Sequence, residues 1–355
     1  MYVQYGNSMK ALVKYARGNG NMEIRDIPEP KPGPGQVKIE VKAAGICGSD
    51  LHIYHDDIDG IPINPPVITG HEFCGVVVEV GEGVTEWKPG DRVTSETAYS
   101  FCGKCHYCIT GYYNLCNNRR TLGYWYNGAF AKYTMVPHER VHALPDSIDF
   151  VSGALIEPLA CITHAVLELT TITVSDVVLV QGPGAIGLAT MQVAKSQGAT
   201  VIVSGTDVDA ERLKMAKELG ADYTINVQQE DLSKFVSELT NGRGVDIVFE
   251  CSGVGRAIDG ALNVIKKQGQ FTQIGLFGKP ITIDFERICY KELKVTGSLG
   301  SRWTSWEKAI QLLEQGKVKT KPLVSHQFPI TEWEKAFEMF ESKQGLKLVL
   351  LPVED

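Results

Sequence analysis

Four cysteines stand close together in the first half of the chain. Their spacing, Cys102-x2-Cys105-x2-Cys108-x7-Cys116, places four sulfur ligands within fifteen residues. Four thiolates can close a tetrahedral Zn²⁺ site with no open position, which shapes a loop without taking part in chemistry. The alternative is a pair of disulfides, which a reducing compartment disfavours. The spacing therefore predicts a structural zinc site.

A second set of possible metal ligands is scattered along the chain. It consists of Cys47 in Gly-Ile-Cys-Gly-Ser-Asp, His71 and Glu72 in Gly-His-Glu, and Glu157 in Ile-Glu-Pro-Leu-Ala. One thiolate, one imidazole and one or two carboxylates would leave a coordination position open, as a Lewis-acid zinc requires. Spacing alone does not bring these residues together. As single residues, Cys47 and His71 are more often part of a core.

A glycine-rich turn follows an apolar stretch and precedes a helical pattern. Its residues are Gly182-Pro-Gly184-Ala185-Ile186-Gly187. In this context Gly182 allows a tight turn, Gly184 lets the backbone approach a pyrophosphate, and Gly187 lets helix and strand pack closely. The N-terminus of the helix offers N–H groups to the phosphates. The turn predicts dinucleotide binding.

An acidic residue, Asp207, lies twenty residues beyond Gly187, at the end of the next expected strand. A carboxylate there can accept hydrogen bonds from a ribose 2′-hydroxyl and would repel the 2′-phosphate of NADP, so NAD is favoured. Arg212 is the complication, because an arginine near the ribose can accept a phosphate. Asp207 could also be a solvated loop acid.

The elements that must position these residues change character along the chain. From about Met9 to Leu144, short apolar stretches with strand-like alternation are cut by Pro and Gly, which indicates a mainly β region. From about Ala154, apolar strands alternate with helical patterns, which predicts an α/β fold with a doubly wound parallel sheet. Strands are expected at 176–180, 200–203, 223–227, 245–249, 269–274 and 293–296, a helix capped by Asp209 and another at 306–315, and a final strand at 346–353.

Size and charge narrow the class of protein. The 355 residues, 43% of them hydrophobic, suggest two domains. A net charge of -7 gives no basic stripe for nucleic acid or an anionic membrane, so a small-molecule substrate is expected. No apolar run reaches the ~20 residues of a membrane span, and residues 1–10 lack the pattern of a signal peptide. Residues 1–8 form an apparent extension before the first expected strand. We expect a cytoplasmic enzyme.

Taken together, the chain from Met9 onward resembles the zinc-containing medium-chain dehydrogenase/reductase superfamily, in its sorbitol, threonine and butanediol dehydrogenase branch. The motifs that carry the resemblance are GICGSDLH at 45–52, GHEFCG at 70–75, KPGDRV at 88–93, the four cysteines, EPLA at 157–160, the glycine turn and FECSG at 249–253. The resemblance implies a GroES-like catalytic domain at 1–155 with a structural zinc lobe at 100–117, a Rossmann NAD-binding domain at 156–296, and a C-terminal segment, 297–355, that completes the catalytic domain. It also implies a homo-oligomer, a dimer or a tetramer.

The resemblance implies a catalytic zinc in addition to the structural one, so two zinc ions per chain. Cys47 and His71 match two ligands of that catalytic zinc. The third ligand is the carboxylate of Glu72, that of Glu157, or the two in exchange, because members of this branch differ here.

The resemblance further implies a path for the proton and the hydride. Ser49 matches the hydroxyl that receives the substrate proton, and His52 matches the residue that passes it toward solvent. The hydride goes from the substrate carbon to the nicotinamide. Ile274 and Leu276 match backbone beside the nicotinamide, and Arg302 matches a residue that reaches cofactor or substrate. Taken alone, His52 would be a surface histidine.

The candidate substrate residues are Tyr54, His55, Tyr124 and Trp125, which combine aromatic walls with polar tips. They could also be ordinary loop residues. The expected activity is hydride transfer between a secondary alcohol, a polyol or sugar alcohol, and NAD. The alternatives are a threonine or 2,3-butanediol dehydrogenase and a zinc-free quinone or enone reductase, which metal content would distinguish.

Overall fold

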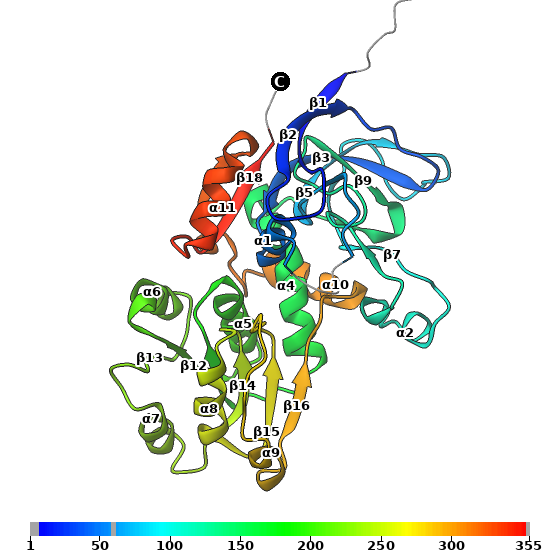
Figure 1. Cartoon of the computed structure of the whole chain (residues 1–355). Coiled ribbons are helices and arrows are strands. Elements are labelled where there is room, and N and C mark those ends of the chain that lie inside the picture. The colour runs from blue at the N-terminus through cyan, green and yellow to red at the C-terminus, as the bar shows by residue number, and fades with distance from the viewer. Residues whose placement is uncertain (1–6, 58–61, 353–355) are drawn as a thin grey trace, which may run out of the picture. The chain divides into compact units, whose positions relative to one another are not determined.

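The computed structural model describes residues 7–57 and 62–352, which form two compact units (Figure 1). Unit 1 comprises the described residues up to Pro158, Ser301–Ile310 and those from Thr320 onward; unit 2 comprises Leu159–Gly300 and Gln311–Lys319. The predicted domains 1–155, 156–296 and 297–355 stay a prediction, and residues 311–319 of the predicted C-terminal segment fall in unit 2. Residues 1–6, most of the apparent extension, and Val353, in the expected final strand, lie outside the described residues.

Unit 1 is built mainly of antiparallel strands. Strand β3 (Gln36–Gly45) pairs along most of its length with β5 (Glu72–Val80), and also with β9 (Tyr133–Pro137) and with β18 (Lys347–Leu351) from the far end of the chain. The same sheet holds β6 (Arg92–Ser95), β10 (Val141–Ala143) and β17 (Val324–Pro329). The other strands of unit 1 are β1 (Ser8–Lys14), β2 (Met22–Pro28), β4 (Val67–Ile68), β7 (Ala98–Ser100) and β8 (Arg120–Thr121).

Short helices join and cover these strands. They are α1 (Gly48–His55), α2 (His106–Ile109), α3 (Phe150–Gly153) and α11 (Trp333–Glu341). Helix α11 buries Trp333, Ala336 and Phe337, three positions that share one helix face, in the core formed by the strands. Leu348 and Leu350 of β18 join the same core, so both ends of the described chain contribute to unit 1.

Unit 2 contains a six-stranded parallel sheet in the order β13-β12-β11-β14-β15-β16. Its strands are β11 (Val177–Gln181), β12 (Thr200–Gly205), β13 (Tyr223–Asn226), β14 (Val245–Glu250), β15 (Ile265–Gln273) and β16 (Lys294–Gly297). Helices α5 (Ala185–Ser196), α6 (Ala210–Glu218), α7 (Leu232–Leu239), α8 (Gly255–Val264) and α9 (Glu286–Tyr290) lie between them; α4 (Ile156–Thr163) and α10 (Trp303–Glu314) contain residues of both units. The central strands are nearly continuous apolar runs because both of their faces are buried.

The predicted α/β fold with a doubly wound sheet is confirmed. One local expectation is wrong: Asp209 precedes α6, but its carboxylate does not cap that helix. It accepts instead from the backbone N–H and the hydroxyl of Thr206, both at 3.0 Å, and so closes the turn before the helix. Within the described residues, no helix is both long and apolar enough to cross a membrane.

Candidate active site and dinucleotide site

Three of the predicted ligands meet in unit 1. One ligand atom from each of Cys47, His71 and Glu72 lies within 4.8 Å of the other two. Cys47 precedes α1, and Glu72 begins β5 directly after His71. The antiparallel register pairs Gly45 with Glu72, which brings the two segments together although they are more than twenty residues apart. A Cβ atom at position 45 would lie 2.3 Å from Oε2 of Glu72, so a side chain at this position would displace the carboxylate.

Asp50 supports two of these residues. One oxygen of its fully buried carboxylate accepts from the backbone N–H of Cys47 at 2.9 Å, and the other lies 3.6 Å from Nδ1 of His71. Burial alone would lower the pKa of His71, but Tyr124 and Asp50 raise it well above its ordinary value. A carboxylate on the far nitrogen is the usual means of orienting a metal-binding imidazole. Sequence reasoning named Asp50 only within a motif, although its position three residues after Cys47 is a capping signal.

Lys347 pairs with Glu72 inside unit 1. Its ammonium donates to Oε1 of Glu72 at 2.7 Å and to the carbonyl of Ile46 at 2.8 Å. Burial would lower the pKa of Lys347, but the charges of Glu72, Cys47 and Glu157 outweigh it and raise that pKa. Sequence reasoning missed this lysine. The only signal was one charged residue at the start of an apolar strand, Lys-Leu-Val-Leu-Leu.

Ser49 lies beside the three-residue cluster. Its Oγ is 3.5 Å from Nε2 of His71 and accepts a hydrogen bond from the hydroxyl of Tyr124 at 2.6 Å. The Tyr124 ring meets the His71 ring edge to face, with centroids 5.1 Å apart. Burial raises the pKa of Tyr124, so the phenol stays a neutral donor. Ser49, the predicted proton acceptor, and Tyr124, a candidate substrate residue, therefore lie beside the candidate metal ligands.

Other predicted residues lie elsewhere in unit 1. Nδ1 of His52 bonds to Asp57 at 2.7 Å on the exposed side of α1. Tyr54 packs against Trp333 and Phe337, and His55 bonds to Asn19 and Glu341. The Arg120 guanidinium lies over the ring of Trp125, 4.7 Å from the centroid of that ring. Glu157 is buried but does not belong to the three-residue cluster. The roles of these residues stay predictions.

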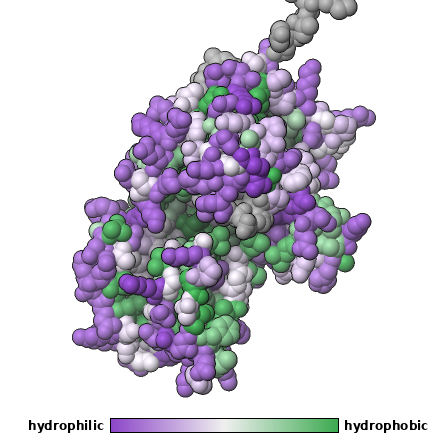
Figure 2. Space-filling model, in the orientation of Figure 1, coloured by the Kyte–Doolittle hydropathy of each residue, from purple (hydrophilic) through white to green (hydrophobic). Residues whose placement is uncertain are grey.

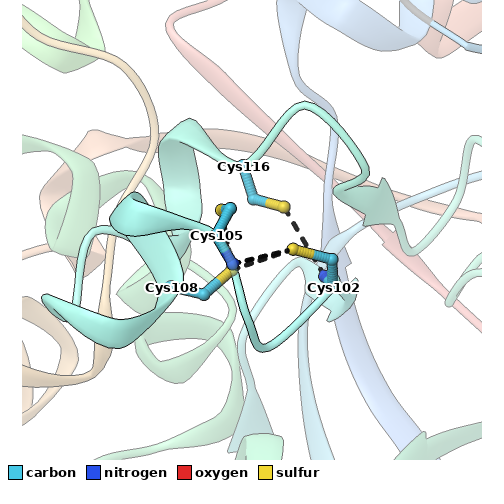
Figure 3. A group of neighbouring side chains, drawn as sticks. All are labelled: Cys102, Cys105, Cys108 and Cys116. Atoms are coloured by element: carbon cyan, nitrogen blue, oxygen red, sulfur yellow. Dashed lines mark hydrogen bonds between the residues drawn. The ribbon is translucent and has the colours of Figure 1, made fainter.

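The four clustered cysteines converge in a lobe of unit 1 (Figure 3). They are not disulfide-bonded, and their sulfur atoms approach to 3.8 Å between Cys102 and Cys108 and to 3.5 Å between Cys105 and Cys108. Zn–S bonds of about 2.3 Å in a tetrahedron place sulfur atoms about 3.8 Å apart. Backbone N–H groups of Lys104 and Cys105 lower the pKa of Cys102 to about 6, which favours its thiolate. Donor set and spacing fit a closed zinc site.

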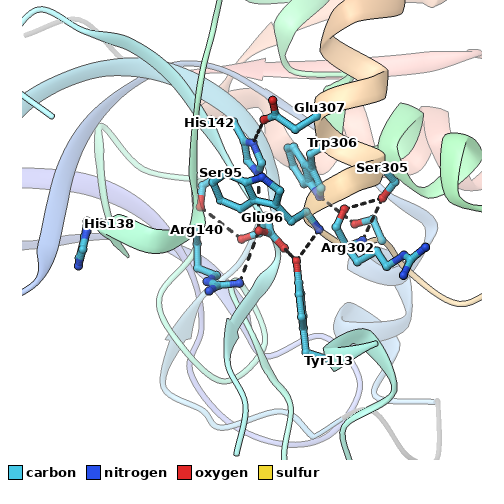
Figure 4. Close-up of polar contacts among 12 residues, drawn as sticks. Ser95, Glu96, Tyr113, His138, Arg140, His142, Arg302, Ser305, Trp306 and Glu307 are labelled. Carbon is cyan, nitrogen blue, oxygen red and sulfur yellow. Dashed lines mark hydrogen bonds and ion pairs between the residues drawn. The ribbon is translucent and has the colours of Figure 1, made fainter. Parts of the chain in front are cut away.

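Tyr113 anchors this lobe to a buried polar network (Figure 4). Its hydroxyl donates to Glu96 and accepts from the backbone N–H of Trp303, both at 2.5 Å. His142 lies 3.5 Å from the other Glu96 oxygen and bonds to Glu307 at 2.8 Å. Burial, reinforced by Glu96, raises the pKa of Tyr113 and keeps it protonated. The lobe is thus fixed at its base, while the side chains of Tyr107, Ile109 and Leu115 are exposed. Figure 2 shows hydrophobic residues among hydrophilic ones on this part of the surface.

The cluster of Cys47, His71 and Glu72 fits a different kind of metal site. One thiolate, one imidazole and one carboxylate are the donors of catalytic zinc sites, which keep a position open for substrate. Oε2 of Glu72 and Nδ1 of His71 are buried without a hydrogen bond among the described residues. A cation at the centre of this cluster would be a second charge partner for the Glu72 carboxylate, beside the Lys347 ammonium.

The glycine turn lies in unit 2 between β11 and α5. Gly182 has a φ of +89°, and a Cβ atom on Gly187 would lie 1.9 Å from the Gly182 carbonyl, so helix and strand approach too closely for any side chain. Gly184 is the N-cap and gives α5 no side-chain cap. The N–H groups of Ala185, Ile186 and Gly187 therefore remain for an anion.

Asp207 lies at the carboxyl end of β12, exposed to solvent. Its Oδ1 accepts from Asn226 and from Gln229, both at 2.7 Å. Both amides donate to the same oxygen, and among the described residues no hydrogen bond to Oδ2 competes with a ligand. Arg212 points to Asp209, with 3.4 Å between Nη1 and Oδ1. This arrangement is compatible with a carboxylate that meets the ribose.

Three further residues, Ile274, Leu276 and Arg302, are predicted to contact the cofactor. Ile274 donates its backbone N–H to the carbonyl of Glu250 at the end of β14, and Leu276 has a largely exposed side chain nearby in sequence. Both belong to unit 2. Arg302 belongs to unit 1, where its guanidinium stacks 4.4 Å from the centroid of Tyr112 in the cysteine lobe. Contact of these residues with a cofactor stays a prediction.

Comparisons with known proteins agree with this geometry. The zinc-binding dehydrogenase family matches residues 185–315, and the alcohol dehydrogenase GroES-like domain matches residues 33–146. A sorbitol dehydrogenase of Halalkalibacterium halodurans is 49% identical over 98% of this chain and 100% of that protein. A D-arabitol-phosphate dehydrogenase of Enterococcus avium is 41% identical over 97% of each chain. The chain therefore belongs to the zinc-containing dehydrogenases of the medium-chain superfamily.

A solved structure shows the same architecture. It is a zinc-binding dehydrogenase from Sinorhizobium meliloti 1021 bound to NADP, with a TM-score of 0.89 and 33% identity, covering 98% of this chain and 100% of that chain.

Proposed function

We propose that the chain is a zinc-dependent polyol dehydrogenase that transfers a hydride from a secondary alcohol to NAD. The observation that carries the proposal is the meeting of Cys47, His71 and Glu72 within 4.8 Å, with the Ser49 hydroxyl beside His71. The sorbitol and arabitol-phosphate dehydrogenases among the relatives support a polyol as the substrate class.

A zinc ion in this cluster would supply Lewis acidity toward the alcohol oxygen, and NAD would accept the hydride. Tyr124 occupies one lone pair of the Ser49 oxygen and leaves the other to accept the proton of the substrate hydroxyl. His52 has Nδ1 engaged by Asp57, so Nε2 is the nitrogen that takes the proton onward. Asp50 keeps the His71 ring oriented.

For the third ligand we favour Glu72 over Glu157, because only Glu72 belongs to the cluster. Zinc analysis of Glu72→Gln and Glu157→Gln tests this choice. We expect Glu72→Gln to hold about one zinc per chain instead of about two, and Glu157→Gln to keep both. The opposite pattern would make Glu157 the ligand.

For the cofactor we propose NAD, supported by Asp207 with one free oxygen at the end of β12. The NADP in the Sinorhizobium structure belongs to that protein. Parallel assays with the two cofactors decide the matter, and a preference for NADP would refute this part of the proposal.

The test of the function is NAD reduction at 340 nm over a panel of sorbitol, other polyols, D-arabitol phosphate, 2,3-butanediol and L-threonine. Each substrate is assayed with fresh and with chelator-treated enzyme. We expect polyols to respond best and chelation to abolish the rate. Activity that survives metal removal, or a response only to enones with reduced cofactor, would replace the proposal with a zinc-free reductase. A response only to threonine or the diol would change the substrate class.

We also propose a cytoplasmic homo-oligomer, a dimer or a tetramer. Strand β16 is an edge of the six-stranded sheet in the described chain, and Val295 and Leu299 on or beside it are about half exposed. An edge strand with apolar neighbours is suited to pairing with a second copy. Light scattering should give two or four times the 38.9 kDa of one chain; a monomer mass would refute this proposal.

A further inference from the structure

Lys14, the last residue of β1, has its side chain fully buried in unit 1. Its ammonium donates to three backbone carbonyls, those of Gly18 at 2.5 Å, Gly20 at 2.6 Å and Tyr54 at 3.1 Å. These three bonds use every proton of the ammonium. Among the described residues, no carboxylate comes within 4.0 Å of it, so carbonyl oxygens replace the water that surrounds an exposed lysine.

Burying an ammonium is costly unless its hydrogen bonds are satisfied. Burial lowers the pKa of Lys14, and Asp56 opposes that effect. Tyr54 is in the last turn of α1, where carbonyls lack partners within the helix and carry the negative end of the helix dipole. Lys14 therefore holds the carboxyl end of α1.

The loop of residues 15–21 fastens the same end of the helix. Gly20 donates its N–H to the Tyr54 carbonyl at 2.9 Å, so this carbonyl receives two hydrogen bonds. Asp56, which follows the helix, accepts from the Gly18 N–H and pairs with Arg17, both at 2.6 Å. Lys14 also binds the carbonyls of the two loop glycines, so one ammonium ties strand, loop and helix together.

The opposite end of α1 carries the candidate chemistry. The helix has eight residues and is about 12 Å long, too short to bend appreciably between its ends. Cys47 stands at its N-cap, Ser49 in its first turn and His52 in its middle. A tilt at Tyr54 is therefore passed to the side chains that meet His71 and Tyr124.

We propose that Lys14 is a positioning residue for the reaction, and that its ammonium in the carbonyl cage of Gly18, Gly20 and Tyr54 holds α1 so that Ser49 and His52 stay aligned for proton removal. The inference rests on the proposed function, because it assigns the proton path to those two residues. A shift of about 1 Å in such a path can lower a rate about a hundredfold.

The test compares Lys14→Met with Lys38→Met. Lys38 is also a buried lysine, on β3, but its partners are Glu29, Glu79 and the ring of Tyr133, none of them in α1. For Lys14→Met we expect kcat to fall at least about tenfold, the KM for NAD to stay within about twofold, and the solvent deuterium isotope effect to rise because proton removal becomes slow. Lys38→Met should leave the isotope effect at the wild-type value.

A second readout does not depend on activity. Hydrogen exchange of the α1 amides should accelerate in Lys14→Met and not in Lys38→Met, because only the first variant frees the helix end. If the wild-type chain oxidises no alcohol, the proposed function fails, yet the exchange comparison still tests the clamp. Unchanged exchange in Lys14→Met, or a kcat within twofold of wild type, would overturn the inference.

Chemical rescue separates positioning from general damage. Lys14→Ala removes Cγ, Cδ, Cε and Nζ, and n-propylammonium has the same four heavy atoms. We expect this amine to restore kcat several-fold in Lys14→Ala, with no effect in Lys38→Ala and none from propionate, which also has three carbons but is negative. Equal rescue of the two alanine variants, or none in Lys14→Ala, would show that the cage does not control the reaction.

Discussion

The ammonium nitrogen of Lys347 lies 2.5 Å from Oε2 of Glu72, and both side chains are buried. The two residues are 275 positions apart, and β18 brings the lysine to the end of β3. The same carboxylate thus serves as a partner in a buried ion pair and as a candidate metal ligand. The C-terminal strand thereby helps to set the charge of the cluster.

This pair predicts a large and non-additive loss of stability. Lys347→Met leaves the Glu72 carboxylate buried without its partner, which should lower the free energy of unfolding by about 3–5 kcal/mol. Adding Glu72→Gln removes that charge and should recover a large part of the loss. Urea unfolding of metal-free protein measures both. Lys335→Met, which removes an exposed pair with Glu332, should change the stability by less than about 1 kcal/mol. Strictly additive losses would show that Lys347 and Glu72 are not coupled.

The hydrogen bond from Tyr124 to Ser49 predicts that removal of the Tyr124 hydroxyl lowers the rate moderately. Tyr124→Phe removes the hydrogen bond to Ser49 and keeps the ring against His71. The loss of one neutral hydrogen bond, about 0.5–1.5 kcal/mol, should lower kcat about two- to twelvefold. Steady-state kinetics with the best polyol measure it. Tyr126→Phe is the control, since Tyr126 stacks on Tyr99 instead. A Tyr124→Phe rate equal to wild type would mean that Ser49 is oriented by other groups.

Much of the fold, and part of the candidate sites, could be predicted from local sequence patterns. The parallel sheet, the glycine turn and the four-cysteine lobe each depend on neighbours in sequence, and the close contact of Gly187 with Gly182 is the contact that the motif predicts. The strands of unit 2 lie within a few residues of their expected places, most clearly β11, β12 and β14, which are apolar runs bounded by turns. Strand β15 is largely polar and begins four residues earlier than expected.

What escaped prediction depends on long-range register. Lys347 looks like the polar edge of an apolar strand until β18 pairs with β3, and Lys14 looks like an exposed end of β1 until the loop and α1 close over it. Asp209 illustrates a local competition: a turn N–H at Thr206 takes the carboxylate that was expected to cap α6. Burial of a charge is decided by tertiary contacts, which periodicity does not contain.

The cysteine lobe predicts a change in metal content. Cys108→Ser leaves three thiolates, which should reduce bound zinc from about two to about one per chain and lower Tm, because the closed site contributes folding energy. Elemental analysis and thermal unfolding measure the two effects. Cys289→Ser, at the exposed cysteine of α9, should retain both zinc ions. Full zinc content in Cys108→Ser would exclude the four-sulfur site.

The hydrogen bonds of Asp222 predict part of the loss of folding stability at acid pH. Burial alone would raise its pKa, but hydrogen bonds from Lys195 and from the Val201 N–H, both at 2.7 Å, outweigh burial and lower it. A lowered pKa gives stability that is fully present above the unfolded value of about 3.9 and is lost as the pH falls through the folded value. Asp222→Asn should therefore lose less Tm than wild type between about pH 5 and pH 3. Asp259→Asn, which removes an exposed carboxylate of α8, is the control. Parallel Tm curves for Asp222→Asn and wild type would refute the assignment.

Asp207 predicts the cofactor preference of the enzyme. Its Oδ1 is held by Asn226 and Gln229, so Asp207→Asn changes the charge that Oδ2 presents to the ribose. A hydrogen bond to a charged group contributes about 1.5–3 kcal/mol, so the Kd for NAD should rise about ten- to 150-fold. The Kd for NADP should fall, because the carboxylate no longer repels the 2′-phosphate. Fluorescence titration with each cofactor measures both constants without a substrate. Glu230→Gln removes an exposed charge next to Gln229, just after β13, and should leave the ratio of the two Kd values unchanged. This control separates a ribose contact from the general field of unit 2. An equal change in the two Kd values of Asp207→Asn would mean that Asp207 does not discriminate between the cofactors.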